Sequence, residues 1–323
     1  MAKGFYLKKF NMEATDSNFD LEIISLKDDY EGKAVATLIK AKANTGNRKS
    51  VLYIHGFVDY FFHPHVAQKF NDNGFDFYAL DLRKYGRSLL KHQHACYCKS
   101  LDEYYEEISY SIKQINKISG QRVVLIGHST GGLIVSRYAN DGEEKNLVSG
   151  LILNSPFLEM NTSKTELDGL KFVHKWLMKL LPQYAIAQKH MPEAYVKSLH
   201  KNYNGEWDFN LIWKPLLGFP AYFIWLKSII YNQDKLKASS DIQVPVLLIH
   251  SSKSFLPKKN STGVDTADII LNVEHMKQIG PKLGSNVTLL EVKDAMHDVF
   301  LSKVASRNYA FDKMFEWLKI SGL

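Results

Sequence analysis

Residues 123–132 place a serine between an apolar run and a segment with helical spacing. Four apolar residues lead into Gly-His-Ser-Thr-Gly, and further apolar residues follow. This context is typical of a sharp strand-to-helix turn that exposes a serine hydroxyl above the edge of a sheet. Gly127 and Gly131 would remove side chains where the strand and the helix nearly touch. The stretch therefore predicts that Ser129 is a nucleophile and that the N–H of Thr130 faces an oxyanion.

The pattern alone also fits a serine that caps a helix in an ordinary α/β protein. Composition narrows the class of protein. A chain of 323 residues favours one α/β domain with an inserted subdomain, and 45% hydrophobic and 23% charged residues are typical of a globular protein. The net charge of +7 is spread along the chain without a basic cluster, so we expect no nucleic-acid partner and at most peripheral membrane contact.

The lack of a recognisable targeting signal and the spacing of the two cysteines favour a cytoplasmic protein. Residues 1–10 lack the apolar core of a signal peptide, and the apolar stretch 216–230 is too short and too interrupted to span a bilayer. Cys96 and Cys98 are separated by one residue, so a disulfide between them would be strained. A reducing compartment is therefore expected.

Short apolar strands alternate with helical segments along the chain. Strands are expected at residues 19–25, 34–41, 51–54, 75–82, 123–126, 147–153, 244–250 and 287–292, and helices at 64–73, 100–118, 272–283 and 302–318. This alternation predicts an α/β fold with a mostly parallel central sheet and helices on both faces. The first two strands would form an antiparallel hairpin at one edge.

Residues 157–240 interrupt this alternation. They contain no clear buried strand and are rich in large apolar and aromatic residues, among them Trp176, Trp207 and Trp225. We therefore expect a helical cap inserted into a core formed by residues 1–156 and 241–323. Most of its aromatic residues would form the cap's own core. Its exposed apolar surface could face a cleft or form a homodimer interface.

Chemistry in an open parallel sheet lies beyond the carboxyl ends of its strands. Ser129 follows one predicted strand, and His297 lies in the loop after the last one. A hydrolytic serine needs a base within hydrogen-bond reach, and the base needs a carboxylate that holds its tautomer. His297 is therefore the predicted base.

The chain resembles α/β-hydrolases of the monoacylglycerol lipase and lysophospholipase type, which are grouped with serine aminopeptidase-like hydrolases. The resemblance rests on four motifs: His55-Gly56, the run Asp81-Leu82-Arg83 with Gly86-Arg87-Ser88, Gly127-His128-Ser129-Thr130-Gly131, and Ala295-Met296-His297-Asp298. It implies the α/β-hydrolase fold, with Ser129 as nucleophile and His297 as base. It also implies an oxyanion hole formed by the backbone N–H groups of Phe57 and Thr130, and no cofactor or metal.

The position of the acid departs from the family's pattern. The resemblance places an aspartate soon after the strand that ends at His250, but residues 251–255 contain no carboxylate. Residues 266–270 resemble the family's acid motif, displaced by an insertion. Asp268 is therefore the predicted acid, ahead of Asp265 and then Glu159. A helix cap near Leu271 is the alternative role for Asp268.

Other histidines and cysteines are expected to play supporting or neutral roles. His55 should orient its loop, and His128 should point away from the face of the nucleophile. The remaining candidates form two His-x-His pairs and one Cys-x-Cys: His63, His65, His92, His94, Cys96 and Cys98. Their spacing matches no zinc pattern, so solvated loops rather than a metal site are expected.

The predicted activity is ester hydrolysis through an acyl-enzyme, on an ester or lipid-like small molecule. Peptide hydrolysis from an amino terminus is an alternative, which needs an acidic patch that Glu159, Glu166 and Asp168 could supply. A ligand-binding protein without catalysis is a further alternative, because a fold alone does not imply a function.

Overall fold

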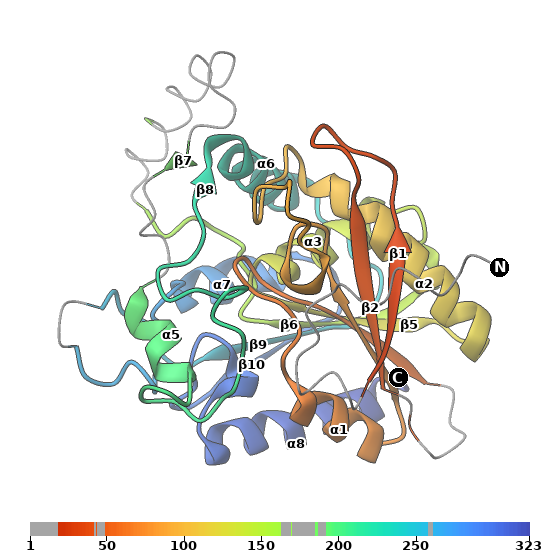
Figure 1. The fold of residues 1–323 in the computed structure, drawn as a ribbon. Helices are drawn as coiled ribbons and strands as arrows, with labels where there is room; N and C mark the ends of the chain where they lie inside the picture. Colours follow the sequence, from red (N-terminus) through yellow and green to blue (C-terminus); the bar gives the residue numbers. More distant parts are fainter. Residues whose placement is uncertain are drawn as a thin grey trace.

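The computed structural model describes residues 19–41, 43, 49–162, 169, 185–186, 192–257 and 261–323. An eight-stranded sheet with the order β1-β2-β4-β3-β5-β6-β9-β10 forms its centre (Figure 1). These strands are β1 (Asp20–Ser25), β2 (Val35–Ala41), β3 (Ser50–Ile54), β4 (Asp76–Asp81), β5 (Val123–His128), β6 (Val148–Asn154), β9 (Val246–Ser251) and β10 (Val287–Val292). β1 with β2 and β2 with β4 pair antiparallel, and the remaining pairs are parallel. The predicted mostly parallel sheet with an antiparallel edge is confirmed.

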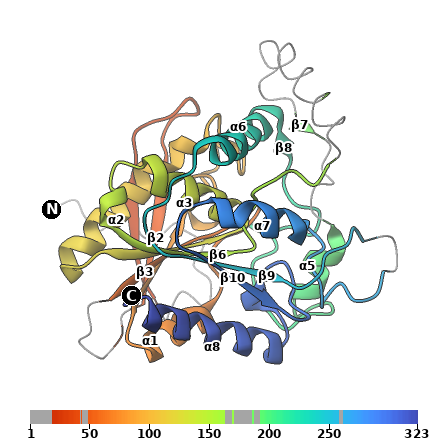
Figure 2. The same ribbon diagram turned by 180° about the vertical axis from the view of Figure 1, so that it is seen from behind.

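Helices cover both faces of this sheet (Figure 2). The helices are α1 (Pro64–Asp72), α2 (Tyr105–Ser119), α3 (Thr130–Asp141), α5 (Glu193–Leu199), α6 (Phe223–Ser239), α7 (Val273–Ile279) and α8 (Val304–Ile320). Five 3₁₀ helices are described: Gly86–Ser88, Leu101–Tyr104, Lys145–Leu147, Gly280–Lys282 and Val299–Leu301. Across the described segments, no helix is both long and apolar enough to cross a membrane.

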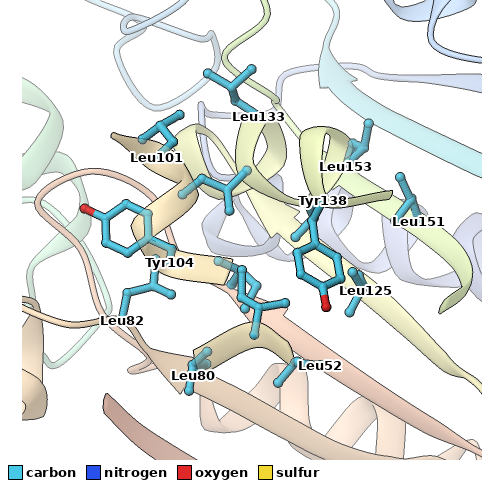
Figure 3. Close-up of a cluster of buried hydrophobic side chains, with 14 of the residues drawn as sticks. Leu52, Leu80, Leu82, Leu101, Tyr104, Leu125, Leu133, Tyr138, Leu151 and Leu153 are labelled. Atoms are coloured by element: carbon cyan, nitrogen blue, oxygen red, sulfur yellow. The ribbon is translucent and has the colours of Figure 1, made fainter. Parts of the chain in front are cut away.

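Alternation of side chains along the strands divides the core between the two faces. Leu52 and Leu125 join the cluster that packs under α2 and α3, where Tyr104 and Tyr138 also lie (Figure 3). Tyr53, the neighbour of Leu52, faces α1 and α8 instead. Full burial of a leucine side chain, such as that of Leu52 or Leu125, stabilises the fold by roughly 1.5–3 kcal/mol.

Two predicted helices begin or end differently from the expectation. The segment predicted as residues 100–118 starts as a 3₁₀ turn, where Ser100 and Glu103 form a reciprocal capping box, and continues as α2. The segment predicted as 272–283 ends as α7 at Ile279 and continues as a 3₁₀ turn. Pro281 explains the change, because proline has no N–H to continue the helical ladder.

Residues 157–240 connect β6 to β9. Their described part includes α5, α6 and a two-residue antiparallel ladder between β7 (Ala185–Ile186) and β8 (Ala221–Tyr222). The ladder is too short to leave an alternating pattern in the sequence. α6 packs on α3, with Asn232 Oδ1 accepting a hydrogen bond from Arg137 Nε at 3.0 Å. The aromatic and apolar residues predicted at positions 176–184 lie outside the described residues, and the division into core and cap stays a prediction.

The expectation of solvated loops is wrong for three of the six histidines and cysteines, whereas His92 and His94 are exposed. His63, Cys96 and Cys98 are fully buried, and both cysteines are free thiols. The loop that carries His63 is buried together with the two phenylalanines that precede it, Phe61 and Phe62. In the described parts of the chain, no group of three or more histidine, cysteine or acidic side chains is arranged to hold a metal ion.

His65 gives the fold a specific sensitivity to acid. Its ring stacks on Trp207, and its Nε2 hydrogen-bonds the carbonyl oxygen of Phe300 at 2.9 Å. Burial, followed by the nearby His63, lowers the pKa of His65 from 6.5 to about 4. The unfolded chain therefore binds this proton at a higher pH than the folded protein does. The free energy of unfolding is therefore highest, as far as His65 is concerned, above pH 6.5. It decreases by about 3 kcal/mol as the pH falls to 4.

We expect urea unfolding of His65→Asn to show a smaller loss of stability between pH 7 and 4.5 than the parent protein shows. His92→Asn is the matched control, because His92 is an exposed histidine in the turn after the 3₁₀ helix Gly86–Ser88. Parallel curves for the parent and His65→Asn would contradict the assignment. The buried Asp59 and Asp298, whose pKa values are lowered from 3.8, act only at lower pH.

Candidate active site

Ser129 occupies a strained turn between β5 and α3. Its backbone angles are φ 53° and ψ −116°, a region that residues with a side chain rarely adopt. A side chain at Gly131 would bring a Cβ atom to 2.3 Å from the carbonyl oxygen of Ile54, and one at Gly127 would lie 2.6 Å from the carbonyl oxygen of Gly131. The strand and the helix thus approach as closely as the sequence suggested. The turn presents Ser129 at the carboxyl end of the sheet.

The loop after β3 lies beside this turn. Ile54 pairs with Gly127 in the parallel ladder, so the exits of β3 and β5 are neighbours. His55 Nε2 accepts a hydrogen bond from the N–H of Leu82 at 3.1 Å, and His55 Nδ1 bonds the carbonyl oxygen of Gly56 at 2.8 Å. His55 therefore joins the loops after β3 and β4, as expected for a loop-orienting residue.

His297 and Asp268 form a buried pair. His297 Nδ1 lies 2.8 Å from Asp268 Oδ2. Asp268 Oδ1 accepts hydrogen bonds from the N–H groups of Ile270 at 2.9 Å and Leu271 at 2.8 Å. Asp268 thus shapes its own turn and also binds the imidazole, while Asn272 is the N-cap of α7.

A short bridge explains how a displaced aspartate reaches this position. Asp268 donates its N–H to the carbonyl oxygen of Lys253, and the N–H of Phe255 donates to the carbonyl oxygen of Asp268, at 3.0 and 3.2 Å. The bridge between Ser254 and Asp268 returns the chain to the exit of β9. The carboxylate therefore lies where the resemblance places one, although it comes later in the sequence.

The two other candidate acids lie elsewhere. The side chain of Asp265 is 41% exposed and pairs with Lys303 at 2.6 Å. Glu159 pairs with Lys237 at 2.6 Å. Of the three predicted candidates, only Asp268 contacts His297.

Ser129 and His297 line a cavity of about 430 Å³. Phe57 and Thr130 line it too, and Thr130 is the first residue of α3, so its N–H has no acceptor within the helix. The ring of Phe57 lies 4.1 Å from that of Trp225 between centroids. The apolar part of the wall consists of Phe57, Val58, Phe157, Met160, Phe219, Ala221, Trp225, Leu226, Leu256, Ile270 and Leu271.

His128 lines the same cavity, so the prediction that it points away is wrong. Alternation along β5 puts Ile126 and His128 on the face of α1 and α8, where the loop after β10 closes over the sheet edge. The rings of His128 and His297 lie 5.0 Å apart. Burial disfavours the imidazolium of His128, but the carboxylates of Asp298 and Asp59 outweigh it and raise its pKa above 6.5.

A buried polar network surrounds His128. Asp298 accepts hydrogen bonds from Asn154 Nδ2 at 2.7 Å and from the N–H of Phe300 at 3.0 Å, and its other oxygen lies 3.0 Å from His63 Nε2. Asp59 joins the network with Lys214 Nζ at 2.7 Å. Asp298 belongs to the motif that contains His297, and Asp59 lies three residues after the motif His55-Gly56. No spacing in the sequence links either residue to Lys214.

Comparison with known proteins gives the family of the chain. Residues 45–302 match the family described as serine aminopeptidase, S33. No curated protein sequence matches the chain.

Several solved structures are similar in fold. A soluble variant of monoglyceride lipase from Saccharomyces cerevisiae, in complex with a substrate analogue, has a TM-score of 0.65 at 18% identity, over 94% of this chain and 97% of its own. Monoacylglycerol lipase from Paleococcus ferrophilus has a TM-score of 0.64 at 23% identity, over 87% and 98%. A thermostable carboxyl esterase from Bacillus coagulans has a TM-score of 0.65 at 15% identity, over 94% and 99%. The chain has the α/β-hydrolase fold of these proteins.

Proposed function

Because this chain belongs to the serine aminopeptidase (S33) family of α/β-hydrolases, we propose that it is a serine hydrolase that cleaves carboxylic esters. Ser129 is the nucleophile, His297 the general base and Asp268 the acid of the triad. The observation that carries the proposal is the 2.8 Å contact between His297 and Asp268, made where His297 and Ser129 line one cavity.

The mechanism is acyl transfer to Ser129 followed by hydrolysis. Asp268 holds Nδ1 of His297, which leaves Nε2 to accept the Ser129 proton during attack on the ester carbonyl. The N–H groups of Phe57 and Thr130 stabilise the oxyanion. His297 then gives its proton to the leaving alcohol, and a water molecule, deprotonated by His297, releases the acid from the acyl-enzyme.

The wall of the cavity supports an apolar acyl or aryl group as the occupant. Phe157, Phe219 and Leu226 come from residues 157–240, so this segment would act as the proposed cap over the sheet edge. Similar folds occur in monoacylglycerol lipases and a carboxyl esterase. A lipid-like ester is therefore the proposed class of substrate.

Hydrolysis of p-nitrophenyl esters from acetate to palmitate tests this proposal. We expect kcat/KM to rise with chain length and then fall, because the cavity holds about 430 Å³ and each methylene transferred to an apolar wall contributes about 0.8 kcal/mol. The fall marks the length of chain that the cavity accepts. A rate that does not depend on the acyl chain would contradict an acyl site at this wall.

The non-catalytic alternative makes a different prediction for the same serine. A ligand-binding protein has no need of an activated hydroxyl group, whereas a serine hydrolase reacts with a fluorophosphonate at its nucleophile. Mass spectrometry of the labelled protein should place the phosphonate on Ser129. No labelling would favour the binding protein, and labelling at another serine would mean that Ser129 is not the nucleophile.

A further inference from the structure

Two of the residues that line the cavity form an ion pair. Lys214 Nζ lies 2.7 Å from Asp59 Oδ1, and both side chains are 2% exposed. Among the described residues that line the cavity, Asp59 is the one acidic side chain and Lys214 the one lysine or arginine. The two residues come from different parts of the chain: Asp59 follows the loop of Phe57, and Lys214 lies in the segment between β6 and β9.

Both oxygens of the Asp59 carboxylate have partners. Oδ1 binds Lys214, and Oδ2 lies 3.3 Å from His128 Nδ1. Burial opposes ionisation of Asp59, but the Lys214 ammonium and the His128 ring outweigh it and hold the pKa of Asp59 well below its usual range. Asp59 is therefore a carboxylate, and its charge is already balanced within the protein.

The location of the pair connects it to the reacting serine. His128 contacts Asp59 on one side and lies 5.0 Å from the ring of His297 on the other, and it directly precedes Ser129. A carboxylate at this place could bind the amino group of a substrate whose carbonyl lies at Ser129. A buried ion pair also contributes little net stability compared with a well-packed apolar pair, so stability alone does not account for it.

We propose that Lys214 is a specificity-determining residue whose ammonium group occupies Asp59 and so excludes substrates that carry a positively charged amino group near the scissile bond. This inference rests on the proposed function and deepens it. A substrate ammonium would meet a like charge and, among the described residues that line the cavity, would find no free carboxylate. A neutral ester would meet the N–H donors of Lys214, of which Asp59 uses one. The cavity therefore takes neutral acyl groups and rejects aminoacyl groups, although the family is described as serine aminopeptidase.

The test compares two esters that differ only in an α-amino group, 2-naphthyl propionate and the 2-naphthyl ester of L-alanine. At about pH 6.5 the amino group is charged. The readout is the ratio of kcat/KM for the alanine ester to that for the propionate, because a general loss of activity cancels in it. Lys214→Met should raise this ratio about tenfold or more, whereas Lys214→Arg, which keeps the charge, should leave it within about threefold of the parent value.

The double variant Asp59→Asn/Lys214→Met tests the partner. It removes the carboxylate as well, so the ratio should fall back by about fivefold or more from that of Lys214→Met. Lys214→Gln, which keeps a donor to Asp59 without the charge, replaces the methionine variant where that variant does not fold. An unchanged ratio in the neutral variants, in a protein that hydrolyses the propionate ester, would overturn the inference and leave the proposed function intact.

A binding measurement distinguishes failure of the inference about Lys214 from failure of the proposed function. If the parent protein hydrolyses neither ester, the proposed function fails, and the same exclusion is measured with octylammonium and 1-octanol as ligands. Calorimetry should then show that Lys214→Met gains affinity for octylammonium by about tenfold relative to octanol. An equal change for both ligands would overturn the inference.

Discussion

Ser129→Ala is expected to lower kcat for p-nitrophenyl butyrate by about 10⁵-fold, measured in the steady state against the buffer rate. Without the hydroxyl group no acyl-enzyme forms, and the remaining rate comes from the oxyanion donors and from binding alone. Ser129 is only 8% exposed, and alanine keeps its Cβ atom in the same turn. The variant should therefore bind substrate and melt close to the parent temperature.

Ser252→Ala is the matched control for this change. Ser252 follows β9 at the same edge of the sheet, but it does not line the cavity. Its replacement should leave kcat within about twofold of the parent value. Activity of Ser129→Ala within about tenfold of the parent would show that Ser129 is not the nucleophile.

The fold could be predicted because its signals are local and repeated. Buried strands such as β3 and β5 are short apolar runs, and the helices between them show apolar residues at helical spacing. Ser129 and His297 were placed by the same reasoning, since each follows a strand whose carboxyl end lies at one edge of the sheet. Position along a regular element is thus sufficient to bring these two residues together.

The polar network around His128 could not be predicted in this way. Asp59 and Lys214 are 155 positions apart, and their contact depends on how an irregular segment packs over the sheet edge. The sequence predicts His63 to lie in a solvated loop. It is buried instead, in contact with Asp298 on another loop of the chain, and no local pattern predicts that contact. Contacts between loops leave no periodic pattern, so a sequence can suggest the residues but not the pairing.

Asp268 lies between these two cases. Its motif identified it as a candidate, but only the bridge to Ser254 places it next to His297. Asp265 fits the order of residues along the chain equally well, yet its carboxylate pairs with Lys303. The motif ranked Asp268 first, but which of the two aspartates contacts His297 depends on a loop conformation that the sequence does not encode as a regular element.

Asp268→Asn should lower kcat by about 10⁴-fold in the same assay, with little change in KM. An asparagine amide that donates to Nδ1 of His297 stabilises the tautomer whose Nε2 carries the proton, and this tautomer cannot accept the proton of Ser129. The side-chain oxygen of asparagine still accepts from the N–H groups of Ile270 and Leu271, which in the parent protein bind Asp268 at 2.9 and 2.8 Å. The turn should therefore survive, and thermal unfolding should confirm it.

Asp265→Asn provides the comparison, because it removes a charge three residues away without touching the imidazole. Its carboxylate is exposed and its pair with Lys303 lies at the surface, so kcat should stay within about twofold of the parent value. If Asp265→Asn instead lost the activity and Asp268→Asn kept it, the loop after β9 would have to rearrange during catalysis to bring Asp265 to His297. Equal and small effects of both substitutions would mean that His297 acts as a base without a carboxylate partner, and the buried contact with Asp268 would then serve the turn alone.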